Sequence, residues 1–180
     1  MLKRVMTAIG LVLAGLSLIA AAAAQETGSP DAPRELAEGF VYFTDSQGVW
    51  LKSETIRLPS DLDAHQTGRL IVQKLFDGPS GMGLVRLWSE KTRLNAFFIT
   101  DDAKAYVDLD IPGTDGIKEI RREMDTRKEL LALYSLVNSL AVNIPQVKQV
   151  KILIRGTDAQ TLAGHLDTDY FYTTNMLIVK

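Results

Sequence analysis

The sequence contains no cysteine and only two histidines among 180 residues, and 20 Lys and Arg are offset by 22 Asp and Glu. The absence of cysteine excludes disulfides, a thiol nucleophile, a thiolate zinc site and a lipid-modified cysteine. A net charge of -2 gives no excess of cations for phosphates, which argues against nucleic acid as a partner. The hydrophobic fraction of 46% is typical of one globular domain and excludes a wholly disordered chain.

Residues 1–24 have the organisation of a secretory signal peptide. Lys3 and Arg4 give a positive start, residues 8–20 are apolar apart from small Gly and Ser, and three alanines precede Gln25. The uncharged run is also about long enough to cross a bilayer, so an uncleaved anchor is the alternative. We expect cleavage and export to the periplasm or the extracellular space as a soluble protein, with membrane attachment only if the signal stays uncleaved.

Residues 25–39 combine glycine, serine, two prolines and acidic residues with almost no large apolar side chain. Such a segment buries too little to offset its ordering entropy, so we expect a flexible leader. Beyond it, residues 40–43 and 50–58 flank turn residues and predict a β-hairpin. Imperfect alternation at Ser53 and Glu54 suggests a bulge in its second arm.

Apolar stripes at helical spacing predict two helices, one between Ser60 and Gly78 and one over residues 130–144. The charged stretch 118–129 mixes both signs, including Glu129, and is typical of a solvated helix face. Further strands are expected at residues 84–88, 94–99, 103–109 and 147–154. This order predicts a single small α+β domain, in which two main helices pack on one mixed β-sheet.

Seven motifs in order carry a resemblance to a known family, at residues 42–48, 75–84, 92–94, 105–109, 134–140, 147–156 and 161–167. They include Leu-Phe-Asp-Gly-Pro at 75–79 and Ala-Tyr-Val-Asp-Leu at 105–109. The series resembles the GerMN domain, a module of a bacterial sporulation and germination lipoprotein. The resemblance spans residues 40–167 and leaves 168–180 as a C-terminal tail or edge strand.

The resemblance implies an α+β fold similar to ring-building modules of envelope machines, and a non-enzymatic role in interaction or assembly. Two departures from the family pattern limit what it implies. The lipoprotein cysteine is missing, and the module occurs once where the sporulation protein carries two copies. A role in sporulation is therefore not carried over to this chain.

Candidate polar residues have structural and functional interpretations. Asp45 lies in a predicted turn, where aspartate bonds nearby backbone. Asn138 lies in an apolar helix and must bond a neighbouring segment, or contact a ligand or partner. His165 should tie a loop to the core, although His165 with Asp167 could also begin a metal site that would need more ligands. We therefore predict no catalytic residue, no cofactor and no metal site.

Two classes of function remain. The first is an envelope module that binds another protein or itself through a sheet edge or the C-terminal segment, with Tyr170, Phe171, Tyr172 and Leu177 as contact residues. Folding of that segment back onto its own domain is the alternative. The second class is a protein that binds cell-wall glycan or a small ligand, with Trp50, Trp88 and Tyr170 as stacking faces. Clustering of these rings on one exposed face would favour the second class, and their burial the first.

Overall fold

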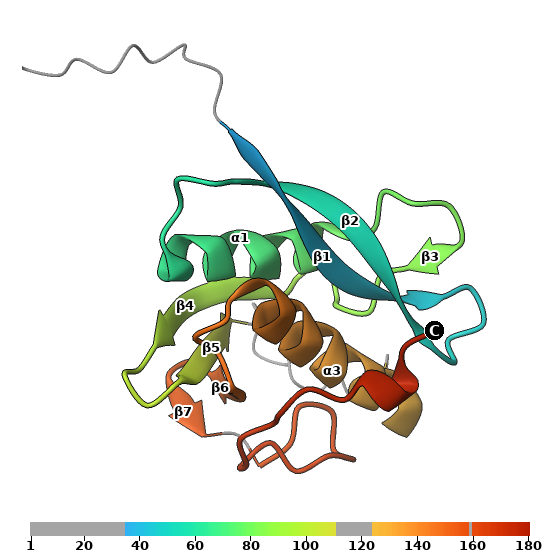
Figure 1. Ribbon diagram of the computed structural model, residues 1–180. Coiled ribbons are helices and arrows are strands. Elements are labelled where there is room, and N and C mark those ends of the chain that lie inside the picture. Colours follow the sequence, from blue (N-terminus) through green and yellow to red (C-terminus); the bar gives the residue numbers. More distant parts are fainter. Residues whose placement is uncertain (1–34, 111–123, 159) are drawn as a thin grey trace, which may run out of the picture. The chain divides into compact units, whose positions relative to one another are not determined.

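The computed structural model describes residues 35–110, 124–158 and 160–180 (Figure 1). The expected signal peptide, residues 25–34 of the expected leader, and residues 111–123 lie outside the described residues. The described part contains two α-helices and two small sheets, ordered β2-β1-β3 and β4-β5-β6-β7. The predicted α+β class with two helices is confirmed, whereas the single mixed sheet is replaced by two sheets.

The first sheet is built on the predicted hairpin. β1 (Leu36–Asp45) pairs antiparallel with β2 (Leu51–Pro59), and the two-residue β3 (Leu84–Val85) pairs with the end of β1. β1 begins at Leu36, inside the expected leader, because exposed residues there still pair with the end of β2. The register runs without a shift past Ser53 and Glu54, so the expected bulge is wrong.

Helix α1 (Ala64–Asp77) follows, and residues with clear capping roles stand at both of its ends. Asp63 and Gln66 form a capping box at its start. Gly78 follows its last residue at a positive φ of 90°, and Pro79 cannot continue the helix. Its buried face consists of Gly68, Ile71, Val72, Leu75 and Phe76. A Cβ atom at Gly68 would lie 2.1 Å from the Phe97 ring, so glycine is what lets α1 approach the second sheet.

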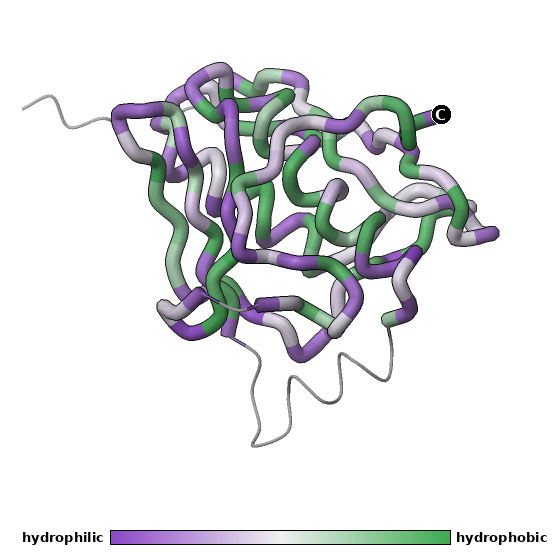
Figure 2. Tube along the Cα trace, turned by 90° about the horizontal axis from the view of Figure 1, so that it is seen from below, coloured by the Kyte–Doolittle hydropathy of each residue, from purple (hydrophilic) through white to green (hydrophobic). Residues whose placement is uncertain are grey.

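The second sheet is mixed. β4 (Arg93–Ile99) and β5 (Lys104–Asp110) form the predicted hairpin, β6 (Gln149–Ile154) pairs parallel with β5, and the short β7 (Thr157–Asp158) pairs antiparallel with β6. The expected strand 84–88 contributes only its first two residues to a sheet. Apolar residues, green in Figure 2, gather in the interior of the trace, where the two sheets and the helices share one core.

Helix α3 (Thr126–Asn143) packs against both β1 and β6, and it is buried on more sides than the predicted stripe. Its buried residues include polar ones at a four-residue spacing, which places them on one face. Ser135 donates to the carbonyl of Tyr42 at 2.6 Å, and Ser139 accepts from the Tyr42 N–H at 3.0 Å. Asn143 accepts from the Phe40 N–H at 2.9 Å and donates to its carbonyl at 2.6 Å.

These bonds explain why the strands form two sheets. The backbone groups of Phe40 and Tyr42 point away from β2, where another strand would normally pair with them. Side chains of α3 occupy that position instead. The edge of β1 is therefore already paired, and the second sheet cannot join it there.

The C-terminal segment folds back onto the domain. Tyr172 and Val150 exchange two backbone hydrogen bonds of 2.8 Å each. Asn138 donates to the carbonyl of Asn175 and accepts from its N–H, at 3.0 and 2.9 Å. After the short 3-10 helix η1 (Met176–Ile178), the Lys180 N–H donates to the carbonyl of Leu51 at 2.9 Å. The segment makes isolated bridges and not the continuous edge strand that we considered.

We predict that Ser139→Ala lowers the free energy of unfolding by about 1–3 kcal/mol, because it leaves the buried N–H of Tyr42 without an acceptor. Urea titration followed by circular dichroism measures the change. The matched control is Ser53→Ala on the exposed face of β2, which should stay within about 0.5 kcal/mol of the parent. Equal stabilities of the two variants would contradict the role assigned to α3.

Deletion of residues 170–180 should lower the melting temperature, because it removes the partners of Val150, Asn138 and Leu51 together. Leu177→Ser serves as the control, since the side chain of Leu177 is 89% exposed and its loss should be nearly silent. A melting temperature unchanged by the deletion would show that the segment contributes nothing to the fold.

Candidate functional site

Asp45 makes the backbone hydrogen bonds that are expected of an aspartate in a turn. Its carboxylate accepts from the N–H groups of Val49 at 2.9 Å and Trp50 at 3.4 Å, inside the β1–β2 turn. The hydrogen bond from Val49 is the main reason why the pKa of Asp45 lies below its usual range. Asp45 thus orders the hairpin, and Asn138 likewise uses both amide atoms on the C-terminal segment.

The loop that contains His165 is bound to the side chain of Glu129 through backbone N–H groups. The Glu129 carboxylate accepts from the N–H groups of Ala163 at 2.7 Å, His165 at 3.0 Å and Leu166 at 3.2 Å. The amide of His165, and not its exposed imidazole, ties this loop to α3. The expectation that Glu129 is solvated is wrong, since it is 1% exposed. The first turn of α3 faces the loop, whose three N–H groups satisfy the buried charge.

The four expected contact residues of the C-terminal segment divide into two pairs. Phe171 packs edge-on against Tyr106 at 5.4 Å, and the ring of Tyr172 lies 6.0 Å from that of Tyr134. Tyr170 and Leu177 are 66% and 89% exposed. Phe171 and Tyr172 are half-buried, so Tyr170 and Leu177 are the more exposed pair.

The three expected stacking residues do not form a common platform. Trp88 is buried and packs edge-on against Phe76 at 5.5 Å. Trp50 is half-buried, with the Lys180 ammonium 4.2 Å from its ring centre. Only Tyr170 of the three is largely exposed. The rings therefore do not cluster on one exposed face, as glycan binding would require, and only Trp88 meets the burial criterion set for protein binding.

The described residues contain no cluster of side chains suited to binding a metal ion. No group of three or more histidine, aspartate or glutamate side chains there could hold a metal ion. His65 lies on α1 against the Phe97 ring, while His165 lies in the loop after β7. Within the same part of the chain, no helix is both long and apolar enough to cross a membrane.

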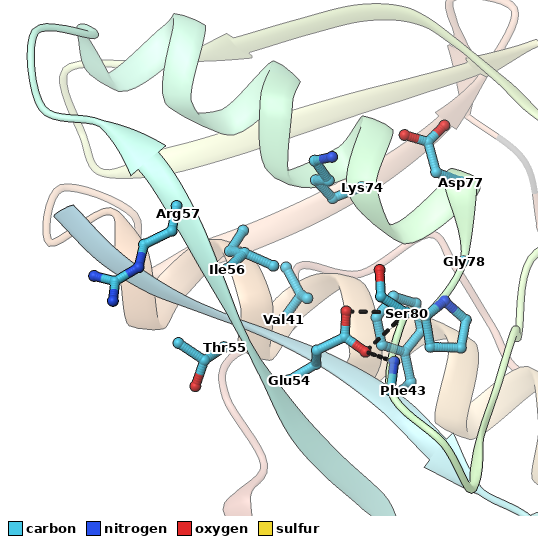
Figure 3. A pocket seen from close by; sticks show the side chains of 12 residues that line it. Val41, Phe43, Glu54, Thr55, Ile56, Arg57, Lys74, Asp77, Gly78 and Ser80 are labelled. Carbon is cyan, nitrogen blue, oxygen red and sulfur yellow. Dashed lines mark hydrogen bonds between the residues drawn. The ribbon is translucent and has the colours of Figure 1, made fainter. Parts of the chain in front are cut away.

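A groove that the sequence did not predict lies between the first sheet and the C-terminal end of α1 (Figure 3). Its volume is about 680 Å³. Apolar side chains of β1 and β2 line one side, namely Val41, Phe43 and Ile56. Lys74 and Asp77 of α1 and the loop 78–81 line the other. No histidine lines it.

Glu54 closes one end of the groove. Its carboxylate accepts from the N–H of Ser80 at 3.0 and 3.1 Å and from that of Gly81 at 2.8 Å (Figure 3). The loop after α1 is thereby fixed to β2. The sequence pattern indicated only a bulge at Glu54, and no local signal shows that its partner lies 26 residues further on.

β2 borders the groove and is also the open edge of its sheet. In an antiparallel pair, the backbone groups of alternate residues point to the neighbouring strand. Thr55 faces Phe40, whose own backbone groups point to α3, so those of Thr55 point outward. The same holds for Ser53 and Arg57. In the described part of the chain none of these three has a backbone partner, whereas Lys180 covers Leu51.

The carboxylates that line the groove accept hydrogen bonds, whereas its cationic side chains have no ion-pair partner among the described residues. Glu54 is bonded to two amides, and the Asp77 carboxylate accepts from the side chain of Gln73 at 2.8 Å. Arg57 and Lys74 have no ion-pair partner among the described residues. The groove therefore combines the partly exposed Ile56, both signs of charge and an adjoining open strand edge, while the side chain of Arg57 points to the opposite face of β2 (Figure 3).

For the loop held by Glu129, we predict that Glu129→Gln destabilises the protein by about 1–3 kcal/mol, because an amide cannot accept three N–H bonds without turning its own NH₂ toward a donor. Amide hydrogen exchange of Ala163 and His165 should accelerate. Glu90→Gln is the matched control, because the Glu90 side chain is 85% exposed and its ion pair contributes little. Unchanged exchange in Glu129→Gln would contradict the assignment.

Solved structures share the fold. A Clostridium perfringens protein assigned as a lipoprotein is 22% identical over 79% of this chain and 91% of its own, with a TM-score of 0.51. The first GerMN domain of the Bacillus subtilis sporulation protein GerM is 16% identical over 77% of this chain and 98% of that domain, with a TM-score of 0.59. The tandem GerMN domains of GerM give the same identity and TM-score over 86% of this chain and 51% of theirs.

No functionally curated protein matches the chain. Residues 40–160 match the Germane family, which is described as "Sporulation and spore germination". Because this match covers more than half of the 180 residues, the chain belongs to the Germane family, and its domain is of the GerMN type that the motifs predicted.

Proposed function

We propose that this protein is a non-enzymatic module of the cell envelope that binds another protein along the outer edge of β2. The observation that carries this proposal is the open backbone of Ser53, Thr55 and Arg57 beside the groove. An unpaired strand edge next to a groove is the arrangement used in β-strand addition, where the backbone provides affinity and the groove provides selectivity.

The location outside the cytoplasm rests on the sequence of residues 1–24, which has the features of an export signal. It agrees with the assignment of the Clostridium perfringens relative as a lipoprotein. After export the mature chain would be periplasmic or extracellular. Membership of the family and the fold are compatible with assembly or interaction at the envelope, without specifying the partner.

Binding fits the groove better than turnover does. A hydrolytic site needs a nucleophile or an activated water beside a general base. Ser80 is the hydroxyl residue in the loop that lines the groove, and no histidine lies with it. The nearby carboxylate of Glu54 is held by two amides. The glycan alternative loses one of its three expected stacking faces because Trp88 is buried.

The test is site-specific photo-crosslinking in the source cells, with a photoreactive amino acid at Ser53 of the full-length protein. We predict a discrete protein adduct from Ser53, and none from the exposed Gln146, which does not line the groove. Thr55→Pro should abolish the adduct, because it removes an outward N–H while sparing the bonds to β1. Arg57→Pro is a second variant with the same design.

Circular dichroism of both proline variants serves as the control for folding, and we expect both to remain folded. An adduct from Ser53 that persists in the folded proline variants, or that appears equally from Gln146, would contradict binding at the β2 edge. Absence of any adduct from Ser53 would contradict the proposed function itself.

A further inference from the structure

We infer that residues 176–180 form a strap that competes with the partner for the edge of β2 and can be displaced from it. The strap covers the outward-facing backbone of Leu51, at the start of the edge that the proposed function uses. This inference rests on the proposed function and adds a means of controlling the same site.

The strap lies where one end of an added strand would lie. Val179 forms a parallel bridge with Leu51, and the Lys180 N–H donates to the carbonyl of Leu51 at 2.9 Å. Figure 1 shows this end of the chain, in red, beside the start of β2. Leu51 is two residues before Ser53, so its backbone groups point to the same outer edge. A partner strand can therefore reach Leu51 only if the strap leaves.

The contacts that hold the strap are few and weak. Besides the bridge, the Lys180 ammonium lies 4.2 Å from the ring centre of Trp50, and Ile178 and Val179 are half-buried against the core. None of the five side chains of the strap is fully buried. An exposed cation–π contact and an isolated bridge each contribute little compared with a continuous strand pair. The strap can therefore open without unfolding the domain.

The strap has a fixed anchor and can move as a unit. Immediately before it, Asn175 exchanges two hydrogen bonds with the buried Asn138, at 3.0 and 2.9 Å. Within it, the Val179 N–H donates to the carbonyl of Met176 at 3.2 Å, a bond that does not depend on β2. Opening therefore breaks the contacts near Leu51, while the chain up to Asn175 stays in place.

Displacement of the strap lengthens the open edge. With the strap bound, the outward-facing residues at positions 53, 55 and 57 are available, and Pro59 has no N–H to offer beyond them. Without the strap, Leu51 adds a fourth position. At about 3.3 Å per residue, the matching strand grows from roughly five to roughly seven residues. Since a ligand that binds only the open form loses affinity in proportion to the population of that form, the strap weakens binding of the longer strand.

The first experiment repeats the photo-crosslinking in the source cells, with the photoreactive amino acid at Arg57, at the end of the edge remote from the strap. We predict that deletion of residues 179 and 180 raises the yield of the protein adduct about threefold or more, because every molecule is then open. Lys180→Pro should act in the same direction, since it removes the N–H that bonds Leu51. Lys148→Ala removes an exposed cation next to the second sheet and is the matched control, which should leave the yield unchanged.

The second experiment needs no partner. Amide hydrogen exchange of residues 25–180, measured by nuclear magnetic resonance, compares Lys180 with Asn175, whose N–H is bonded to Asn138. After correction for intrinsic rates, we predict that the amide of Lys180 exchanges at least about tenfold faster, because the strap opens while Asn175 keeps its partner. Equal protection of the two amides would overturn the displaceable strap.

The outcomes separate this inference from the proposed function. An adduct from Arg57 whose yield is unchanged or lower in both strap variants would overturn the strap and leave binding at the β2 edge standing. Absence of any adduct from Ser53 and Arg57, in the parent and in the shortened chain, would contradict the proposed function and the inference with it. Circular dichroism checks that the variants are folded, and Lys180→Pro decides the question if the shortened chain is not.

Discussion

The fold depends on how α3 pairs with the backbone of β1. A buried strand must satisfy the N–H and C=O groups on both of its edges, because each unpaired group costs free energy comparable to a lost hydrogen bond. β2 pairs with one edge of β1, and Ser135, Ser139 and Asn143 pair with the other. A helix face thus takes the place of a neighbouring strand. The consequence is that the first sheet ends at α3 along most of β1, and β2 is left as its long edge, opposite the two-residue β3.

The same helix holds two irregular segments by the same means. Glu129 binds the loop around His165 through three N–H groups, and Asn138 binds Asn175 of the C-terminal segment through both amide atoms. Each of these α3 side chains is buried, and each has its partners. Buried polar groups that are fully bonded specify one arrangement of the chain, because a shifted packing would leave them unpaired. The polar residues inside α3 therefore place segments that have little regular structure of their own.

The periodicity of the sequence predicted the helices and strands whose formation depends on residues close together in the chain. Both helices, the two hairpins and β6 follow from local spacing and from helix-ending residues such as Gly78. The division into two sheets did not follow, because it depends on bonds between Asn143 and Phe40, 103 residues apart. The groove was missed for a similar reason. Val41 reads as core and Glu54 as surface, and only the tertiary fold places them beside the loop after α1.

The open edge of β2 also has to avoid indiscriminate pairing. Exposed edges tend to aggregate, and proteins limit this with charges, proline, short edges or a covering segment. Here Lys180 covers one end, Pro59 ends the strand, and Lys52, Glu54 and Arg57 place charged side chains along it. The part of β2 that can still pair is therefore short, from Ser53 to Arg57. A partner strand would have to fit between these two limits or displace Lys180, so the features that shorten the edge also restrict which segments can pair with it.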